Sequence, residues 1–224
     1  MANTTPTSSG LRLETPLEEV LDVREFSIDD GLSTLFSVDL EVTSDNPALD
    51  LDELIGQPST FRVALGEGAY DGTSERAWSG VVSEAHLLRS EPSGLSTYQL
   101  SLAPALWLLT RRTNCRVYQQ MTDLDVARAM LGEWGIDPIV ECSRPLKTRK
   151  YRVQYQETDF TFLCRLLEAA GITFYHRTEE GQSRLVLPHA PRRGPGPSAA
   201  PPFRDPPLPG PPHPTGLPPS RPPT

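Results

Sequence analysis

The sequence has no apolar run long enough to cross a membrane, and its N-terminus, MANTTPTSSG, lacks the basic and apolar segments of a secretory leader. A spanning helix needs about 20 mostly apolar residues, and a signal peptide needs a charged segment followed by an apolar one. We therefore expect a cytoplasmic protein with no signal peptide and no membrane insertion.

Cysteine and histidine are too few and too scattered for a disulfide framework or a metal clip. Cys115, Cys142 and Cys164 are odd in number and show no C-x-x-C spacing. No two histidines have the spacing of metal ligands; they are His86, His176, His189 and His213. We expect reduced cysteines and no metal site.

Phosphate-binding and nucleic-acid-binding signatures are also missing. Gly66 and Gly68 are not followed by the third glycine of a dinucleotide fingerprint, and no Walker motif occurs, so we expect no cofactor. Residues 14–53 hold thirteen acidic side chains and one basic side chain, Arg24. This balance argues against a nucleic-acid partner. It leaves two interpretations, a solvated acidic face or a surface for an electropositive partner.

Two pairs of residues are candidates for catalytic groups. Glu157 and Asp159 could act as paired carboxylates, but acidic residues are common at a helix start because of the helix dipole. Cys164 and His176 could act as nucleophile and base, but Cys164 lies beside the apolar stripe of a helix, where a thiolate is disfavoured. We expect no catalytic, cofactor-binding or metal-binding residues, and hence no enzyme.

Short alternating apolar segments before Pro104 predict a small antiparallel barrel. The expected strands cover residues 18–28, 35–42, 60–65, 78–85 and 97–102. A turn is expected at residues 29–31 and a short helical turn at residues 49–55. Gly66, Gly68 and Gly72 are expected in one loop, and residues 91–94 form another turn.

The chain after Pro104 predicts helices mixed with strands. A short helix is expected around residues 106–109, and a second helix over residues 123–134 with Thr122 as its cap and Asp125 three residues on. A strand follows in which Tyr151, Val153 and Tyr155 form the apolar face. A further helix begins at Thr158 and ends at Gly171, and strands are expected at residues 172–176 and 184–187.

Composition changes sharply near residue 188. Sixteen of the 24 prolines follow residue 187, and this tail holds four arginines and one aspartate, so the rest of the chain carries all the acidic excess. Proline at this density removes backbone donors and prevents a packed core. We expect a predominantly β, α+β protein with a disordered N-terminus at 1–13, a β-barrel domain at 14–103, an α+β subdomain at 104–187 and a disordered proline-rich tail at 188–224.

The strongest family signal is the run VQYQETDFTFLCRLLEAAGITFYH. It closely resembles the signature of the VgrG proteins, the spike-tip components of type VI secretion, which are similar to the hub of a phage tail baseplate. Three more stretches agree in order: FSIDDGLSTLFSVDLEVTSDNPALDLDELIGQPSTFRV, SGVVSEAHLL and YQLSLAPALWLLTRRTNCRVYQ. The resemblance covers residues 14–187 and the N-terminal, hub-like part of the family, so the chain is truncated relative to it.

This resemblance implies a non-enzymatic structural component of a contractile injection apparatus. It implies a homotrimer that docks on an Hcp-like tube protein, contacts baseplate components and is exported through the type VI apparatus. The later barrel and β-helical needle of the family have no counterpart here, so we expect no stable trimer from this chain alone. The alternatives are a decayed gene fragment without function, or an interaction protein that recruits a partner through its proline-rich tail.

Overall fold

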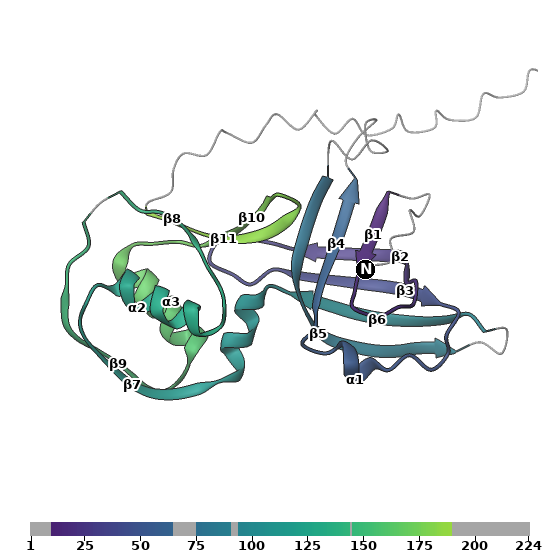
Figure 1. Cartoon of the computed structure of the whole chain (residues 1–224), viewed down its shortest axis with the longest axis horizontal. Helices are drawn as coiled ribbons and strands as arrows, with labels where there is room; N and C mark the ends of the chain where they lie inside the picture. The colour runs from purple at the N-terminus through teal and green to yellow at the C-terminus, as the bar shows by residue number, and fades with distance from the viewer. Residues whose placement is uncertain (1–9, 65–74, 91–93, 144, 190–224) are drawn as a thin grey trace, which may run out of the picture. The chain divides into compact units, whose positions relative to one another are not determined.

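The computed structural model describes residues 10–64, 75–90, 94–143 and 145–189. Figure 1 shows an antiparallel sheet in the first half of the chain and a pair of helices flanked by further strands in the second half. The expected α+β fold, predominantly β, is confirmed. The loop expected at Gly66, Gly68 and Gly72 lies outside the described residues, as does the proline-rich tail from residue 190.

The first half forms one curled sheet of six strands in the order β1-β4-β5-β6-β3-β2. Its strands are β1 (Leu11–Glu14), β2 (Asp22–Asp29), β3 (Ser37–Ser44), β4 (Pro58–Ala64), β5 (Glu75–Ser90) and β6 (Ser96–Ala103). Every neighbouring pair is antiparallel. Within the described ranges β1 and β2 are the two edges, so the predicted small antiparallel barrel is present as a curled half-barrel.

Alternation in the sequence places the core on the inner side of this sheet. In β3, Val38, Leu40 and Val42 are buried, whereas Asp39 and Glu41 between them point the other way, as the period of two requires. Opposite them in β6, Leu100 and Leu102 are buried on the same face. The short helix α1 (Leu51–Leu54) is capped by the Asp50 side chain, which confirms the expected helical turn.

Ordered structure begins earlier than predicted, at β1. Residues 11–13 were expected in the disordered N-terminus, but Leu11 pairs with Val63 and Leu13 with Phe61. The backbone oxygen of Gly10 also accepts a hydrogen bond from Ala64 at 2.9 Å. A four-residue segment has too weak a pattern to predict a strand alone, and it becomes one because β4 offers a free edge.

Gly80 marks a close approach inside the half-barrel. A Cβ atom at this position would lie 1.9 Å from the backbone oxygen of Ala103. Only glycine therefore allows β5 to meet the end of β6, where Val81 pairs with Ala103.

We expect Gly80→Ala to lower the free energy of unfolding by about 2 kcal/mol or more, because the added methyl group must push backbone away from backbone. Gly132→Ala is the matched control. It lies in a helix with nothing within 4 Å of the added Cβ, and alanine there should stabilise by up to about 1 kcal/mol. Urea unfolding of the two variants measures the difference, and equal stabilities would contradict the close approach.

The second half is built on two helices with clear end signals. In α2 (Asp123–Glu133), the Thr122 side chain accepts from the Asp125 backbone and the Asp125 carboxylate accepts in return. In α3 (Asp159–Ala170), Thr158 caps the start and Gly171 ends the helix in the left-handed conformation, with φ of 69°. These caps and ends confirm the predicted helices. The short helix expected after Pro104 is a 3-10 helix, η1 (Ala105–Arg111).

The helices share a core of their own. Val126, Met130 and Leu131 of α2 pack in one buried cluster with Phe162 and Leu166 of α3. The stripes predicted from the 3.6-residue period are therefore the buried faces. The half-barrel has a separate cluster, which includes Phe36, Phe61, Trp78 and Tyr98.

A two-stranded ribbon covers these helices and corrects one prediction. β7 (Thr113–Met121), which the sequence analysis missed, pairs antiparallel with β9 (Arg149–Thr158). The apolar side of β9 was expected to be buried, but Tyr151, Val153 and Tyr155 are 67%, 40% and 70% exposed, while Gln154 is buried. The strand buries its polar side because charged and amide groups on that side bind partners on the helices, as described below.

A small three-stranded sheet completes the second half, in the order β10-β11-β8. β10 (Tyr175–Glu179) pairs antiparallel with β11 (Gln182–Pro188), and β8 (Ile139–Glu141), also missed in the sequence analysis, pairs parallel with β11. Hydrogen bonds join this region to the half-barrel. The Ser33 amide donates to the Phe174 oxygen at 2.7 Å, and the Thr178 hydroxyl donates to the Ala77 oxygen at 2.9 Å.

Candidate assembly surfaces

Asp159, weighed above as a catalytic group, is instead the centre of a buried polar network. Its side chain is fully buried, and its carboxylate accepts hydrogen bonds from four side chains at the start of α3. These donors are Arg112 at 2.7 Å, Asn114 and Gln154 at 2.9 Å, and Trp134 at 3.3 Å. Burial alone would raise the pKa of Asp159, but the hydrogen bonds outweigh it and hold that pKa below its usual range. The four hydrogen bonds that Asp159 accepts therefore join α3 to α2 and to the ribbon.

Glu157 has a different partner, so the two carboxylates do not act as a pair. It forms an ion pair with Arg165 of α3, and the Arg165 guanidinium also donates to the Val153 oxygen at 2.9 Å. Asp123 plays a similar part at the start of α2, where Arg149 and Arg152 of the ribbon bind its carboxylate. These contacts explain why the polar side of β9 faces inward.

Cys164 and His176 lie in different surroundings. Cys164 lines a cavity of about 430 Å³ with Leu167, Gly171 and Phe174, and burial raises the pKa of its thiol to about 11, so it is protonated at neutral pH. His176 packs edge-on against Phe36, with ring centroids 5.0 Å apart. Neither side chain is prepared for nucleophilic chemistry.

His176 makes folding sensitive to mild acid. Burial lowers its pKa to about 4, whereas an unfolded histidine titrates near 6.5. The unfolded chain therefore binds this proton more readily, and the stability that neutral His176 contributes is complete above about pH 6.5 and is lost as the pH falls toward 4. We expect His176→Gln to flatten the fall in thermal midpoint between about pH 6.5 and pH 4.5. His86→Gln, on the exposed side of β5, is the control, and an equal slope in both variants would contradict the assignment.

The remaining candidate ligands do not converge. Within the described ranges no group of three or more histidine, cysteine, aspartate or glutamate residues could hold a metal ion. Cys115 is exposed, and none of the three described cysteines, Cys115, Cys142 and Cys164, is in a disulfide. His213 lies outside the described residues. No described helix is both long and apolar enough to span a lipid bilayer.

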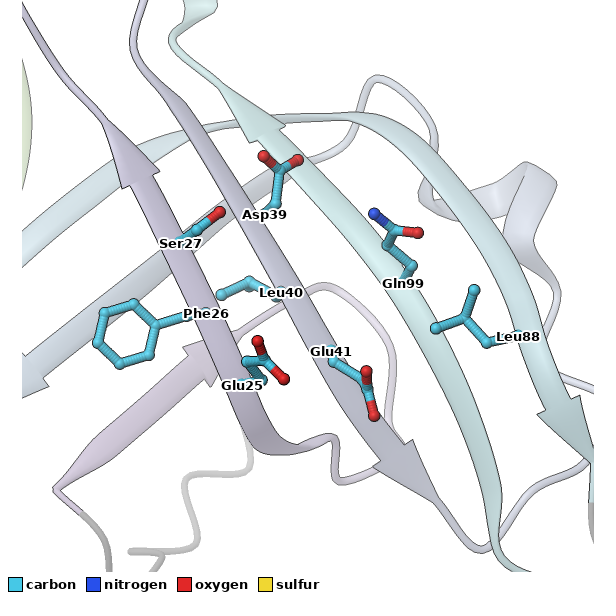
Figure 2. A pocket seen from close by; sticks show the side chains of 8 residues that line it. All are labelled: Glu25, Phe26, Ser27, Asp39, Leu40, Glu41, Leu88 and Gln99. Carbon is cyan, nitrogen blue, oxygen red and sulfur yellow. The ribbon is translucent and has the colours of Figure 1, made fainter.

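Three of the thirteen acidic residues counted in residues 14–53 lie together on the outer side of the half-barrel. Figure 2 shows Glu25 from β2 beside Asp39 and Glu41 from β3, with Gln99 of β6 across from them. Together with Leu88 of β5 they line a shallow depression of about 230 Å³. The depression is open, and the Asp39 carboxylate is held by the Ser101 hydroxyl. The sequence predicts the acidic character of this region, and the fold brings these three carboxylates to one face of the sheet.

The described residues present three distinct surfaces to solvent. They offer an acidic sheet face, the free edges β1 and β2, and the apolar outer face of the β7–β9 ribbon. A curled antiparallel sheet joined to a helix-containing subdomain is the architecture of a tail-hub protein.

Comparison with known proteins identifies the family. A family model described as the phage tail baseplate hub (GPD) matches residues 29–208. The type VI secretion system spike proteins VgrG1c and VgrG1a of Pseudomonas aeruginosa are 35% and 31% identical over 80% and 88% of this chain. The chain belongs to the phage tail baseplate hub family. That family is a structural one and not a family of enzymes.

Solved structures agree with this assignment. The Escherichia coli c3393 protein, a component of the type VI secretion system with structural similarity to the T4 tail proteins gp27 and gp5, matches with a TM-score of 0.70 and 26% identity. The match covers 80% of this chain and 48% of that one. The Francisella PdpA–VgrG complex in its lidless form matches at a TM-score of 0.54 and 8% identity, which shows the fold alone. The chain spans 24% of VgrG1c and 30% of VgrG1a.

Proposed function

We propose that this chain is a non-enzymatic structural component of a contractile injection apparatus, equivalent to the N-terminal hub part of a type VI secretion spike. The observation that carries the proposal is the half-barrel with its helix-pair subdomain, which matches a type VI secretion component at a TM-score of 0.70 over 80% of the chain. The 35% identity to a spike protein over the same share of the chain supports it. These similarities favour a structural role over a gene fragment or a tail-mediated interaction protein.

The proposal includes the partners and the assembly that the resemblance implies. A hub of three copies would dock on an Hcp-like tube protein and contact baseplate components, after synthesis in the cytoplasm and before export through the apparatus. This chain alone is not expected to form a stable trimer. The named relatives are spike proteins, and a VgrG protein occurs in a complex with PdpA. Both facts agree with a role inside a larger assembly.

We also propose that residues 14–103 and 104–187 act as two subdomains of this hub part. Each holds its own buried cluster, one inside the curled sheet and one between α2 and α3. The polar networks at Asp123 and Asp159 fix the second cluster to the ribbon. Such an arrangement presents rigid strand surfaces, which a structural ring needs more than a mobile site.

Co-purification tests the proposal directly. The full chain, carrying an affinity tag, is expressed together with an Hcp-like tube protein and baseplate proteins from the same organism. We expect at least one of them to be retained with the chain at physiological salt. If circular dichroism shows that the chain is folded and none of these proteins is retained with it, the proposed function is wrong.

A charge-reversal variant separates the two interpretations of the acidic face. Glu25→Lys, Asp39→Lys and Glu41→Lys together should abolish retention if the partner is electropositive, because opposed charges at an interface control partner choice. Unchanged retention would assign these carboxylates to solvation. The proposed hub role stands in either case, because it rests on retention by the unmodified chain.

A further inference from the structure

The outer face of the β7–β9 ribbon is apolar in a place where a two-stranded ribbon is normally polar. Figure 1 shows the two strands running side by side along α2 and α3. Val117 of β7 is 60% exposed, and it lies directly opposite Val153, which is 40% exposed. The tyrosines on either side of Val153 are 67% and 70% exposed. Large apolar side chains gathered on one face mark an interaction site more often than chance exposure does.

Ion pairs and hydrogen bonds on the inward side of the ribbon keep the apolar face outward. Arg116 binds Glu133 of α2, Arg152 binds Asp123, and Gln154 donates to Asp159 at 2.9 Å. Turning the strands by one residue would bury Val117 and Val153 but would leave the buried carboxylates of Asp123 and Asp159 without these partners. Loss of a partner from a buried charge costs several kcal/mol. The fold therefore holds the apolar face outward.

The face has the shape and the symmetry to contact another copy of itself. The Val117–Val153 pair lies at its centre, Cys115 faces Tyr155 on one side, and Gln119 faces Tyr151 on the other. The two tyrosines lie on β9, and the smaller side chains of Cys115 and Gln119 lie opposite them on β7. A twofold axis along the strands would place the tyrosines of one copy over Cys115 and Gln119 of the other. The face also carries no charged side chain in these six positions, so two copies do not repel each other there.

We propose that the β7–β9 outer face is a contact surface for a second copy of this chain. Each tyrosine buries roughly 150–250 Å² when fully covered, so two opposed faces with their valines would remove on the order of 1,000 Å² from water, the lower limit for a specific interface. The contact is therefore a weak one, with a dissociation constant on the order of 10–100 μM. It does not depend on the proposed hub function.

Self-association measured against concentration tests the contact. Sedimentation velocity of the full chain is followed from about 5 μM to about 500 μM, for the unmodified protein and for Tyr151→Ser with Tyr155→Ser. We expect the unmodified chain to shift from one copy to two, and the double variant to bind at least tenfold more weakly. Leu87→Ser with Leu88→Ser is the matched control, because these β5 side chains are 48% and 52% exposed and lie outside the ribbon; it should associate like the unmodified chain.

Cys115 provides a second readout that is specific for this face. It is exposed and lies opposite Tyr155, so association should slow its alkylation by a maleimide severalfold at high protein concentration. Peptide mass spectrometry distinguishes it from the other two cysteines. A chain that remains a single copy throughout overturns the proposal. Association that the tyrosine substitutions do not weaken, or that leaves Cys115 equally reactive, overturns it as well.

Discussion

Leu166→Asp is expected to unfold the helix-pair core and to abolish the cooperative transition of this part of the chain. Leu166 is 1% exposed and packs between α2 and α3. The substitution removes an apolar side chain from this cluster and places a carboxylate there without a partner. The combined cost should be about 4 kcal/mol or more, close to the whole stability of a small domain. Circular dichroism with thermal and urea unfolding measures the effect.

Ala169→Asp is the control for this substitution. It adds the same carboxylate to the same helix three residues later, but Ala169 is exposed. The expected cost is about 1 kcal/mol, from lower helix propensity and from a negative charge near the helix C-terminus. If the two aspartate variants unfolded at the same urea concentration, the buried face of α3 would be assigned wrongly.

Asp159→Ala should produce the second large loss, about 3–5 kcal/mol. The substitution leaves the Arg112 guanidinium and the amide groups of Asn114 and Gln154 without the carboxylate that they bind at 2.7–2.9 Å. Glu157→Ala removes a carboxylate two residues away, but its Arg165 partner is about half exposed, so the cost should stay below about 1 kcal/mol. Urea unfolding at pH 7 compares them, and a small loss in both would contradict the central role of Asp159.

The acid dependence of stability gives an independent check on Asp159. Its pKa is lower in the folded chain than in the unfolded chain. The contribution of the charged group is therefore present above the unfolded pKa of about 3.9 and is lost as the pH falls below it. Asp159→Asn cannot titrate, so its stability should fall less steeply below about pH 4 than that of the unmodified chain. Parallel curves would show that another group controls acid unfolding.

The sequence is sufficient to predict those elements whose defining interactions lie within one segment. Thr122 and Thr158 each offer a hydroxyl to the first turn of a helix, and Gly171 takes a left-handed conformation. These interactions join residues only a few positions apart, so the sequence predicts both helices and their buried stripes. The hairpin of β2 and β3 follows from alternating side chains and a turn in the same way.

Prediction failed where a strand depends on a distant partner. β7 carries alternating polar and apolar residues with little apolar excess, and it forms because β9, about 36 residues later, pairs with it. β8 has three residues and depends on β11. The prediction of which face of β9 is buried was also wrong. Alternation with a period of two shows that the two faces of a strand differ, but it does not show which face is covered. Asp159 could have suggested the answer, because buried carboxylates need basic and amide partners at matching positions.

The sequence by itself determined the helices and their caps, five of the six strands of the half-barrel, the acidic character of the first half and the family resemblance, because each is encoded in residues near one another along the chain. The tertiary structure alone decided that the sheet curls with β1 and β2 as edges, that Glu25, Asp39 and Glu41 share one outer face, and that Tyr151, Val153 and Tyr155 point to solvent. These features depend on which distant groups satisfy each other. On β9 the buried carboxylates of Asp123 and Asp159 must be paired, and that requirement outweighs the burial of two tyrosines and a valine.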